Sequence, residues 1–161
     1  MTQEQSTAAP AAATLRDATL SDLDAWLAMR LAMFPHHPVE FLRDELRALL
    51  ADPQRHGAFL SLDNDGALLG FAEVALRTDY VPGMRTSPVA FLEAIYVAPT
   101  ARRRGIARAL VMRAHAWGRA RGCSEFASDA LLDNDASHAM HRALGFVETR
   151  RVVFFRRDID G

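Results

Sequence analysis

The stretch "VAFLEAIYVAPTARRRGIARALV", Val89–Val111, carries the strongest structural signal in the chain. Its first half is apolar and rich in β-branched and aromatic residues, which predicts a strand that ends at Pro99. From Ile106 onwards, apolar residues recur at helical spacing, which predicts a long amphipathic helix. Three arginines, Arg102–Arg104, and Gly105 lie between the two elements. The fold and the function can both be argued from this order of strand, basic turn and helix.

The basic turn has the chemistry of an anion-binding site. The first amides of a helix have no partner within the helix and carry a partial positive charge. Gly105 lets a ligand approach the backbone without meeting a side chain, and Ala107 keeps the next contact small. The arginines add positive charge at the rim. The pattern Arg102-x-x-Gly105-x-Ala107 therefore predicts a pyrophosphate-binding turn, with a solvated basic loop as the structural alternative.

Helices and strands alternate through the rest of the chain. We expect strands at 14–18, 57–62, 67–77, 89–99, 123–129 and 146–159, and helices at 21–34, 39–52, 106–121 and 135–144. Ser21 is the expected N-cap of the first helix, and Asp65-Gly66 is the expected hairpin turn. The last helix is expected to bury a face made of Ala136, Ala139, Met140 and Ala143. This order predicts a single α/β domain with a mixed central β-sheet flanked by helices.

The composition narrows the classes of function. Half of the 161 residues are hydrophobic, enough for a core, and a net charge of −1 excludes a nucleic-acid binder held by bulk charge. The single cysteine, Cys123, excludes a disulfide framework. No apolar run reaches the ~20 residues of a membrane span. Residues 1–13 read as a disordered tail without the features of a signal peptide, so we expect a domain covering 14–161 and a cytoplasmic protein.

Several motifs in the second half of the chain occur together in one known family. The strand "FLEAIYVAP", the turn "RRRGIA", the strand "EFASD" and the helix end "ALGF" resemble the GNAT superfamily of N-acetyltransferases, whose cosubstrate is acetyl-CoA. The wider set "RTDYVPG", "LDN..SH..H" and "ET.RVVFFR" is similar to the aminoglycoside 6'-N-acetyltransferases within it. The resemblance runs from about Leu76 to Ile159 and implies a GNAT fold for the whole domain.

The resemblance also implies a surface for the cofactor. It implies that the pyrophosphate of acetyl-CoA is held by the residues of the basic turn: Arg102, Arg103, Arg104, Gly105, Ile106 and Ala107. In this family the strand before the turn parts from its neighbour, and its free backbone amides hydrogen-bond the pantetheine arm and the thioester oxygen. In this sequence those amides would belong to Ile95, Tyr96 and Val97. Such preorganised donors stabilise a developing oxyanion. Asn134 is assigned to the cofactor as well.

Acetylation of an amine also calls for a carboxylate. An alkylammonium has a pKa of about 10, so roughly one molecule in a thousand is neutral at pH 7. Glu93 is the leading candidate to attract the cation and take its proton, because a charge inside an apolar strand is expensive unless it has a purpose. Strand alternation that turns Glu93 to solvent is the alternative.

Asp129, at the end of "EFASD", is a second catalytic candidate at the amine end. The alternative is that its side chain caps the following turn.

Loop residues extend the predicted substrate pocket. Asp79, Tyr80 and Asp133 would add acidic and aromatic surface that attracts a cationic substrate to a protein of nearly neutral net charge. The resemblance implies that Phe34 and His37 border the same substrate.

His141 is a third catalytic candidate. Many members of the family carry a tyrosine at this position, four residues before the glycine of "LGF", which protonates the leaving thiolate. Histidine can donate a proton near neutral pH, whereas core packing or surface exposure is the structural alternative. His138 and His141 lie three residues apart, but no carboxylate or cysteine at metal-ligand spacing accompanies them, so we predict no metal site.

Together these features predict an aminoglycoside 6'-N-acetyltransferase that uses acetyl-CoA, works by direct attack in a ternary complex and confers antibiotic resistance. Two alternatives stay open: an acetyltransferase for a polyamine, peptide or other metabolite amine, and a non-catalytic acyl-CoA-binding module. The chain end "RRVVFFRR", 150–157, reads as a hydrophobic strand flanked by arginines, and a second copy would cover it. We therefore expect a homodimer, with pairing inside one sheet as the alternative.

Overall fold

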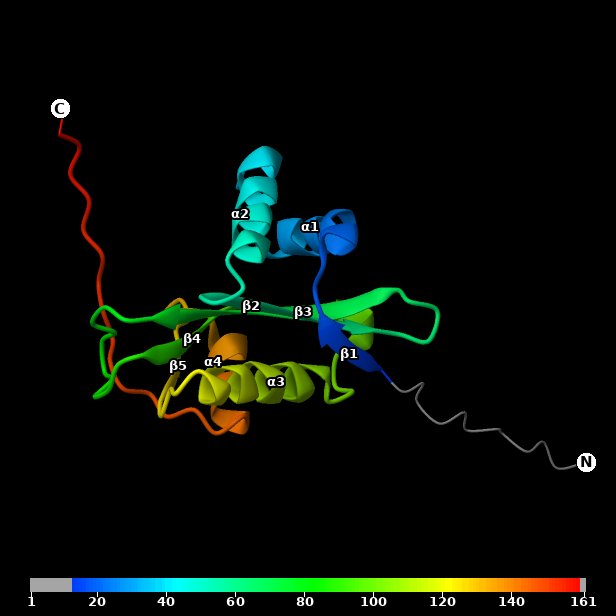
Figure 1. The fold of residues 1–161 in the computed structure, drawn as a ribbon. Coiled ribbons are helices and arrows are strands. Elements are labelled where there is room, and N and C mark those ends of the chain that lie inside the picture. The colour runs from blue at the N-terminus through cyan, green and yellow to red at the C-terminus, as the bar shows by residue number, and fades with distance from the viewer. Residues whose placement is uncertain (1–12, 160–161) are drawn as a thin grey trace, which may run out of the picture.

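The computed structural model describes residues 13–159, arranged as a sheet between two layers of helices (Figure 1). The strands are β1 Thr14–Asp17, β2 His56–Leu62, β3 Leu68–Arg77, β4 Val89–Val97 and β5 Phe126–Ser128. The helices are α1 Leu23–Met33, α2 Val39–Ala51, α3 Ile106–Ala120 and α4 Asp135–Ala143, with single 3₁₀ turns at Leu20–Asp22 and Pro99–Ala101.

The five strands form one sheet in the order β1-β2-β3-β4-β5. Strands β1 to β4 are antiparallel neighbours, whereas β5 pairs with β4 in parallel. The helices α1 and α2 cover one face of this sheet, and α3 and α4 lie on the other (Figure 1). The expected α/β fold with a mixed sheet flanked by helices is therefore confirmed.

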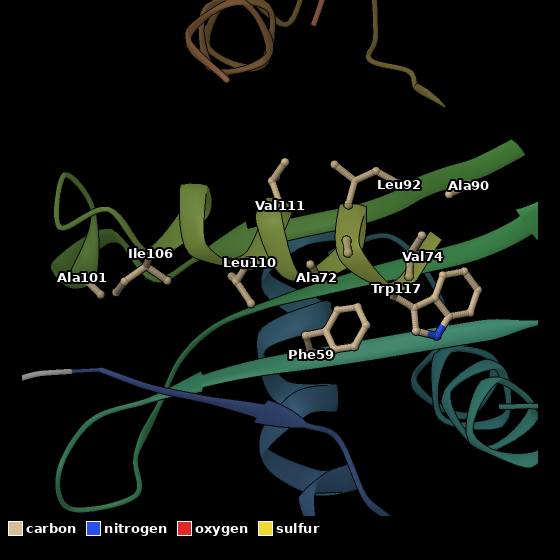
Figure 2. Packing of buried hydrophobic residues seen from close by; sticks show 11 residues of the cluster. Phe59, Ala72, Val74, Ala90, Leu92, Ala101, Ile106, Leu110, Val111 and Trp117 are labelled. Atoms are coloured by element: carbon tan, nitrogen blue, oxygen red, sulfur yellow. The ribbon is translucent and has the colours of Figure 1, made fainter. Parts of the chain in front are cut away.

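Two apolar clusters hold the helices on the sheet. On one face, Leu110 and Trp117 of α3 pack over Phe59 and its neighbours on the strands (Figure 2). On the other face, Trp26 of α1 and Leu46 of α2 are fully buried against the sheet. Both tryptophans are core residues, as expected from their places on amphipathic helices.

The start of the first helix differs from the sequence prediction. Thr19 is the N-cap of a 3₁₀ turn, Leu20–Asp22, that precedes α1, and Asp22 is the N-cap of α1 itself, so the predicted N-cap Ser21 caps neither element. The Asp22 carboxylate accepts hydrogen bonds from the Thr19 amide at 2.8 Å and from its hydroxyl at 3.0 Å. This capping box satisfies donors at the start of the helical segment.

The prediction of a buried alanine face on the last helix is wrong. Ala136, Ala139 and Ala143 are exposed, and α4 has no fully buried residue. The helix instead turns Ser137 and His141 inwards, where the His141 ring reaches Ser128 of β5. The polar edge of α4 faces the sheet because it finds hydrogen-bond partners there.

The two last predicted strands also differ. The strand expected at 123–129 contains only Phe126–Ser128, and residues 146–159 contain no strand. The C-terminal segment runs extended along one end of the sheet and then away from the body of the protein (Figure 1). A strand needs a partner strand for its backbone hydrogen bonds, and the described part of the chain supplies none to this segment.

Of the predicted N-terminal tail, residues 1–12 lie outside the described residues. Between residues 13 and 159, no helix is long and apolar enough to cross a membrane.

A buried carboxylate lies under α1 and α2. Glu73 of β3 is 1% exposed, and its Oε1 accepts a hydrogen bond from Trp26 Nε1 at 3.1 Å. Its Oε2 lies 3.3 Å from Arg30 Nη2, and Arg30 Nη1 lies 3.0 Å from Glu45 at the surface. Burial raises the pKa of the Glu73 carboxyl from 4.5 to about 7, although the Arg30 charge opposes the shift.

This shift predicts a pH-dependent contribution to stability. The folded protein binds the Glu73 proton more tightly than the unfolded chain does. The resulting contribution to the free energy of unfolding is therefore complete below pH 4.5 and is lost as the pH rises through about 7. Glu73→Gln should therefore show a flatter free energy of unfolding between these pH values, measured by urea denaturation.

Glu45→Gln is the matched control, since it also removes a carboxylate from Arg30 but at a partly exposed position. It should keep most of the pH dependence of the wild type, because the Glu45 charge is only a minor cause of the raised pKa of Glu73. An unchanged pH dependence in Glu73→Gln would contradict the assignment.

Candidate functional site

The candidate site lies where β4 and β5 part. The parallel pairing runs from Ala90 opposite Phe126 to Leu92 opposite Ser128, and β5 ends there. Strand β4 continues to Val97, so residues 93–97 have β3 on one side and no described strand on the other. Backbone groups on this open edge are available to a ligand. The open edge includes Ile95, Tyr96 and Val97, the residues predicted to hold the cofactor by their amides.

Two predicted carboxylates follow the last strand pair. Glu93 comes directly after Leu92 on β4, and Asp129 comes directly after Ser128 on β5. Glu93 is also the extra residue of a β-bulge, because Glu73 opposes Ala94 while Val74 opposes Leu92. Bulges often occur next to active sites, where they re-aim a side chain. The topology thus brings both carboxylates to one point of the sheet.

Glu93 has a strong partner that the sequence analysis missed. Arg77, the last residue of β3, donates from Nε and Nη2 to Glu93 Oε1 at 3.0 and 2.7 Å, and from Nη2 to Oε2 at 2.9 Å. The guanidinium also lies 3.6 Å from the centre of the Phe91 ring. Both members of the pair are about one-third exposed. A cation that reaches Glu93 must therefore share its oxygens with Arg77 or displace it.

Two-residue periodicity could have found this pair. The alternation along β3 puts Phe71, Glu73 and Arg77 on one face of the sheet, the face covered by α1 and α2. Glu93 is partly exposed, in line with the alternative that strand alternation turns it to solvent. Its carboxylate is also paired with Arg77.

The other predicted substrate residues line the surface in two groups. Asp79, Tyr80, Asp129 and Asp133 are exposed, and the Asp129 side chain makes no hydrogen bond or ion pair to any residue between 13 and 159. Around the α1–α2 loop, the His37 ring meets Phe34 edge-on at 5.6 Å and stacks on Phe41 at 5.7 Å between ring centres. Phe41, which the sequence analysis did not single out, extends this aromatic surface.

The basic turn has the backbone of an anion-binding nest. Arg103 (φ 62°) and Gly105 (φ 76°) both adopt left-handed conformations, which cost a non-glycine residue such as Arg103 about 1–2 kcal/mol. Gly105 is the N-cap of α3 and leaves the helix without a side-chain cap. A Cβ at this glycine would meet no atom within 4 Å, so the space over the turn is open. This open cradle of amides fits a pyrophosphate group.

The side chains around the turn have mixed roles. Arg102 Nε donates to the Val97 carbonyl at 3.1 Å, so this arginine ties the turn to the end of β4. Ile106 is 4% exposed and anchors α3 in the core, which leaves its backbone amide for a ligand. Ala107 is half-buried behind it, whereas Arg103 and Arg104 are exposed.

The start of α4 supplies two further predicted residues. Asn134 is the N-cap of α4, and its Oδ1 accepts a hydrogen bond from the Ser137 amide at 3.0 Å. This cap explains the residue locally, so a cofactor role for Asn134 stays a prediction. His141 is half-buried, with Nε2 2.8 Å from Ser128 Oγ and Nδ1 2.7 Å from the Ser137 carbonyl oxygen.

A separate hollow of about 270 Å³ lies between α3 and β5. Its lining includes His115, Gly118 and Cys123 but none of the predicted site residues. Among residues 13–159, no three histidine, cysteine, aspartate or glutamate side chains gather in a way that could hold a metal ion.

Comparisons with known proteins give the family. Residues 23–146 match the model of the acetyltransferase (GNAT) family. An aminoglycoside N(6')-acetyltransferase type 1 from Serratia marcescens is 51% identical over 138 residues, which cover 86% of this chain and 94% of that protein.

Solved structures of similar proteins agree. AAC(6')-Iy, solved with the bisubstrate analogue CoA-S-monomethyl-acetylneamine, is 36% identical with a TM-score of 0.86, over 91% of this chain and 99% of that one. The aminoglycoside 6'-N-acetyltransferase AAC(6')-Ih from Acinetobacter baumannii is 42% identical with a TM-score of 0.86, over 92% and 99% of the two chains. With its parted strands, its amide-lined turn and these relatives, the chain belongs to the GNAT family of acetyltransferases.

Proposed function

We propose that this acetyltransferase transfers the acetyl group of acetyl-CoA to the 6'-amine of aminoglycoside antibiotics, by direct attack in a ternary complex. The relatives that it covers almost end to end are named for this activity. The observation in the molecule that carries the proposal is that Glu93 and Asp129 directly follow Leu92 and Ser128, the last paired residues of β4 and β5. Carboxylates at this position can attract a cationic amine to the strand edge that is proposed to hold the thioester.

The cofactor end is formed by backbone more than by side chains. The amides of the turn at 103–107, with Arg103 and Arg104 at its rim, bind the pyrophosphate. The open edge of Ile95–Val97 binds the pantetheine arm and donates to the thioester oxygen. Acetyl-CoA supplies the activated acetyl group. Tight positioning of both substrates supplies much of the rate.

The amine end is formed by acidic and aromatic side chains. Asp129, Asp133 and Asp79 attract the polycationic drug, and Tyr80, Phe34 and His37 line its rings. Glu93 receives the reacting ammonium alongside Arg77 and accepts its proton, directly or through water. The Arg77 fork fixes the orientation of the Glu93 carboxylate before the drug arrives.

The 6' assignment predicts discrimination between two matched drugs. Neomycin carries an amine at the 6' position and paromomycin a hydroxyl, while their other rings are nearly the same. Neomycin should be acetylated. Paromomycin should bind the acidic walls, react poorly and act as a competitive inhibitor, because a hydroxyl is the weaker nucleophile and holds its proton more tightly. Coenzyme A release with each drug, followed by mass and NMR location of the acetyl group, measures this.

Glu93→Gln supplies a second arm of the same experiment. The amide keeps the shape but loses the charge and the base, so turnover of neomycin at saturation should fall more than the affinity for paromomycin.

Equal turnover of the two drugs would contradict the 6' assignment. Acetylation of a simple polyamine alone would favour a metabolite amine as the substrate, and binding of acetyl-CoA without turnover of any amine would favour a non-catalytic module.

We also propose a cytoplasmic location, where the free thiol of Cys123 stays reduced, and cell fractionation tests it. The proposed domain covers residues 14–161, slightly more than the family model matches.

A homodimer is proposed from the C-terminal segment. Val153, Phe154 and Phe155 are 74%, 90% and 94% exposed, which leaves a large apolar surface in water. The segment is extended and unpaired, and arginines flank it. A second copy of the chain, paired with this segment as a strand, would bury the phenylalanines and satisfy the backbone.

Sedimentation at micromolar concentration should therefore give a dimer, and Phe154→Asp should convert it to a monomer. A monomeric wild type at this concentration would contradict the proposal. Val147→Asp, an exposed apolar position before the flanked segment, is the matched control and should remain dimeric.

A further inference from the structure

Ser128 and His141 form a hydrogen-bonded pair at the parting of the strands. Ser128 is the last residue of β5, and its Oγ lies 2.8 Å from Nε2 of His141 on α4. The pair is half-buried, and the His141 ring meets Phe146 edge-on at 5.1 Å between ring centres. Because Leu92 opposite Ser128 is the last paired residue of β4, the Ser128 hydroxyl lies beside the residue that precedes Glu93.

The contacts of His141 fix which ring nitrogen carries the proton. Nδ1 lies 2.7 Å from the Ser137 carbonyl oxygen, which can only accept a hydrogen bond, and 3.3 Å from the Ser137 hydroxyl, which can accept as well as donate. Nδ1 therefore carries a hydrogen, and Nε2 of the neutral ring is an acceptor. Ser128 must then donate its hydroxyl proton to Nε2. The tautomer is set by the backbone of α4, which leaves Nε2 as the functional nitrogen.

Protonation of the ring reverses this hydrogen bond. Nε2 of the imidazolium donates to Ser128 Oγ, and the hydroxyl hydrogen of Ser128 is released to another acceptor. The Leu92 carbonyl oxygen, 3.4 Å from Ser128 Oγ, is such an acceptor at the parting of the strands. The pair can thus present a hydroxyl proton towards the open edge of β4, where the proposed function locates the thioester.

The geometry points to Ser128 as the residue through which His141 protonates the departing coenzyme A sulfur, an inference that rests on the proposed function. The amine nitrogen forms its bond to the acetyl carbon, and the carbon–sulfur bond breaks with its electron pair on sulfur. Ser128 Oγ gives its proton to that sulfur and takes the Nε2 proton of the imidazolium. His141 ends neutral, Ser128 ends as a hydroxyl, and the amine proton leaves through Glu93 to water, which recharges His141.

A pair of isosteric variants separates the relay from packing. Ser128→Thr and Ser128→Val have nearly the same size and shape and differ in the hydroxyl. Ser128→Val should lower the single-turnover rate of neomycin acetylation about 100-fold, as expected for lost proton transfer, with little change in the KM for acetyl-CoA. Ser128→Thr should stay close to the wild type. Equal rates for the two variants would overturn the inference.

A double-mutant cycle tests whether the two residues act as one unit. His141→Gln should lower the same rate to the level of Ser128→Val, and the double variant should lose nothing further. If the two residues only packed independently, the fold decreases in rate of the two single variants would multiply in the double variant, and the KM would rise as the rate falls. Multiplied losses would therefore overturn the relay.

A spectroscopic arm needs no substrate. In the wild-type protein at pH 9, the side-chain ¹⁵N shifts of His141 should show a protonated Nδ1 and an unprotonated Nε2. The opposite tautomer would overturn the relay. The turnover of neomycin by the wild type tests the proposed function separately. If the wild type does not acetylate neomycin but acetylates another amine, the same Thr and Val comparison is made with that amine.

Discussion

The early end of β5 is the constraint on which the rest of the structure depends. A strand that stays paired on both sides offers nothing to a ligand, because its amides and carbonyls are already used. Strand β5 stops at Ser128 while β4 runs on to Val97. This difference leaves a row of backbone groups open, and the turn at Gly105 follows a few residues later at the start of α3. The clusters around Trp26 and Trp117 clamp the sheet from both faces, which keeps the open edge in place.

Two carboxylates of the sheet near the open edge are paired with arginines. Glu93 is paired with Arg77, and the buried Glu73 is paired with Arg30 beneath α1. The exposed carboxylates of Asp79, Asp129 and Asp133 give a protein of nearly neutral net charge a local acidic surface. Because Glu93 already has a cationic partner, an ammonium group that binds there replaces or shares the contact with Arg77. The affinity of Glu93 for a substrate ammonium is then a difference between two ion pairs, which favours selectivity over bulk attraction.

Much of the fold could be predicted from the sequence, and the reasons are local. The apolar run before Pro99, the spacing of Leu110 and Trp117, and the turn at Asp65-Gly66 each predict one element from neighbouring residues. The elements that were mispredicted depend on partners far away in the chain. The alanines of α4 would suit a core, yet a hydrogen bond to β5 turns the opposite edge of the helix inwards.

The candidate site divides in the same way. Glu93, Asp129 and the Gly105 turn could be singled out because their residue types and spacing carry chemistry. Ser128 and Phe41 could not, because their roles arise from strand register and helix packing, and Arg77 could be found only through the two-residue periodicity of β3. The C-terminal segment is a third case, since a strand was predicted where the single chain offers no partner strand.

Amide hydrogen exchange of β4 with and without coenzyme A tests the central claim most directly. We predict that coenzyme A slows exchange at the amides of 93–97 that point away from β3, and at the turn 103–107. Residues Ala90–Leu92, already paired on both sides, should not change. Protection at Ala90–Leu92 alone, or none at all under conditions where calorimetry shows that coenzyme A is bound, would contradict the account.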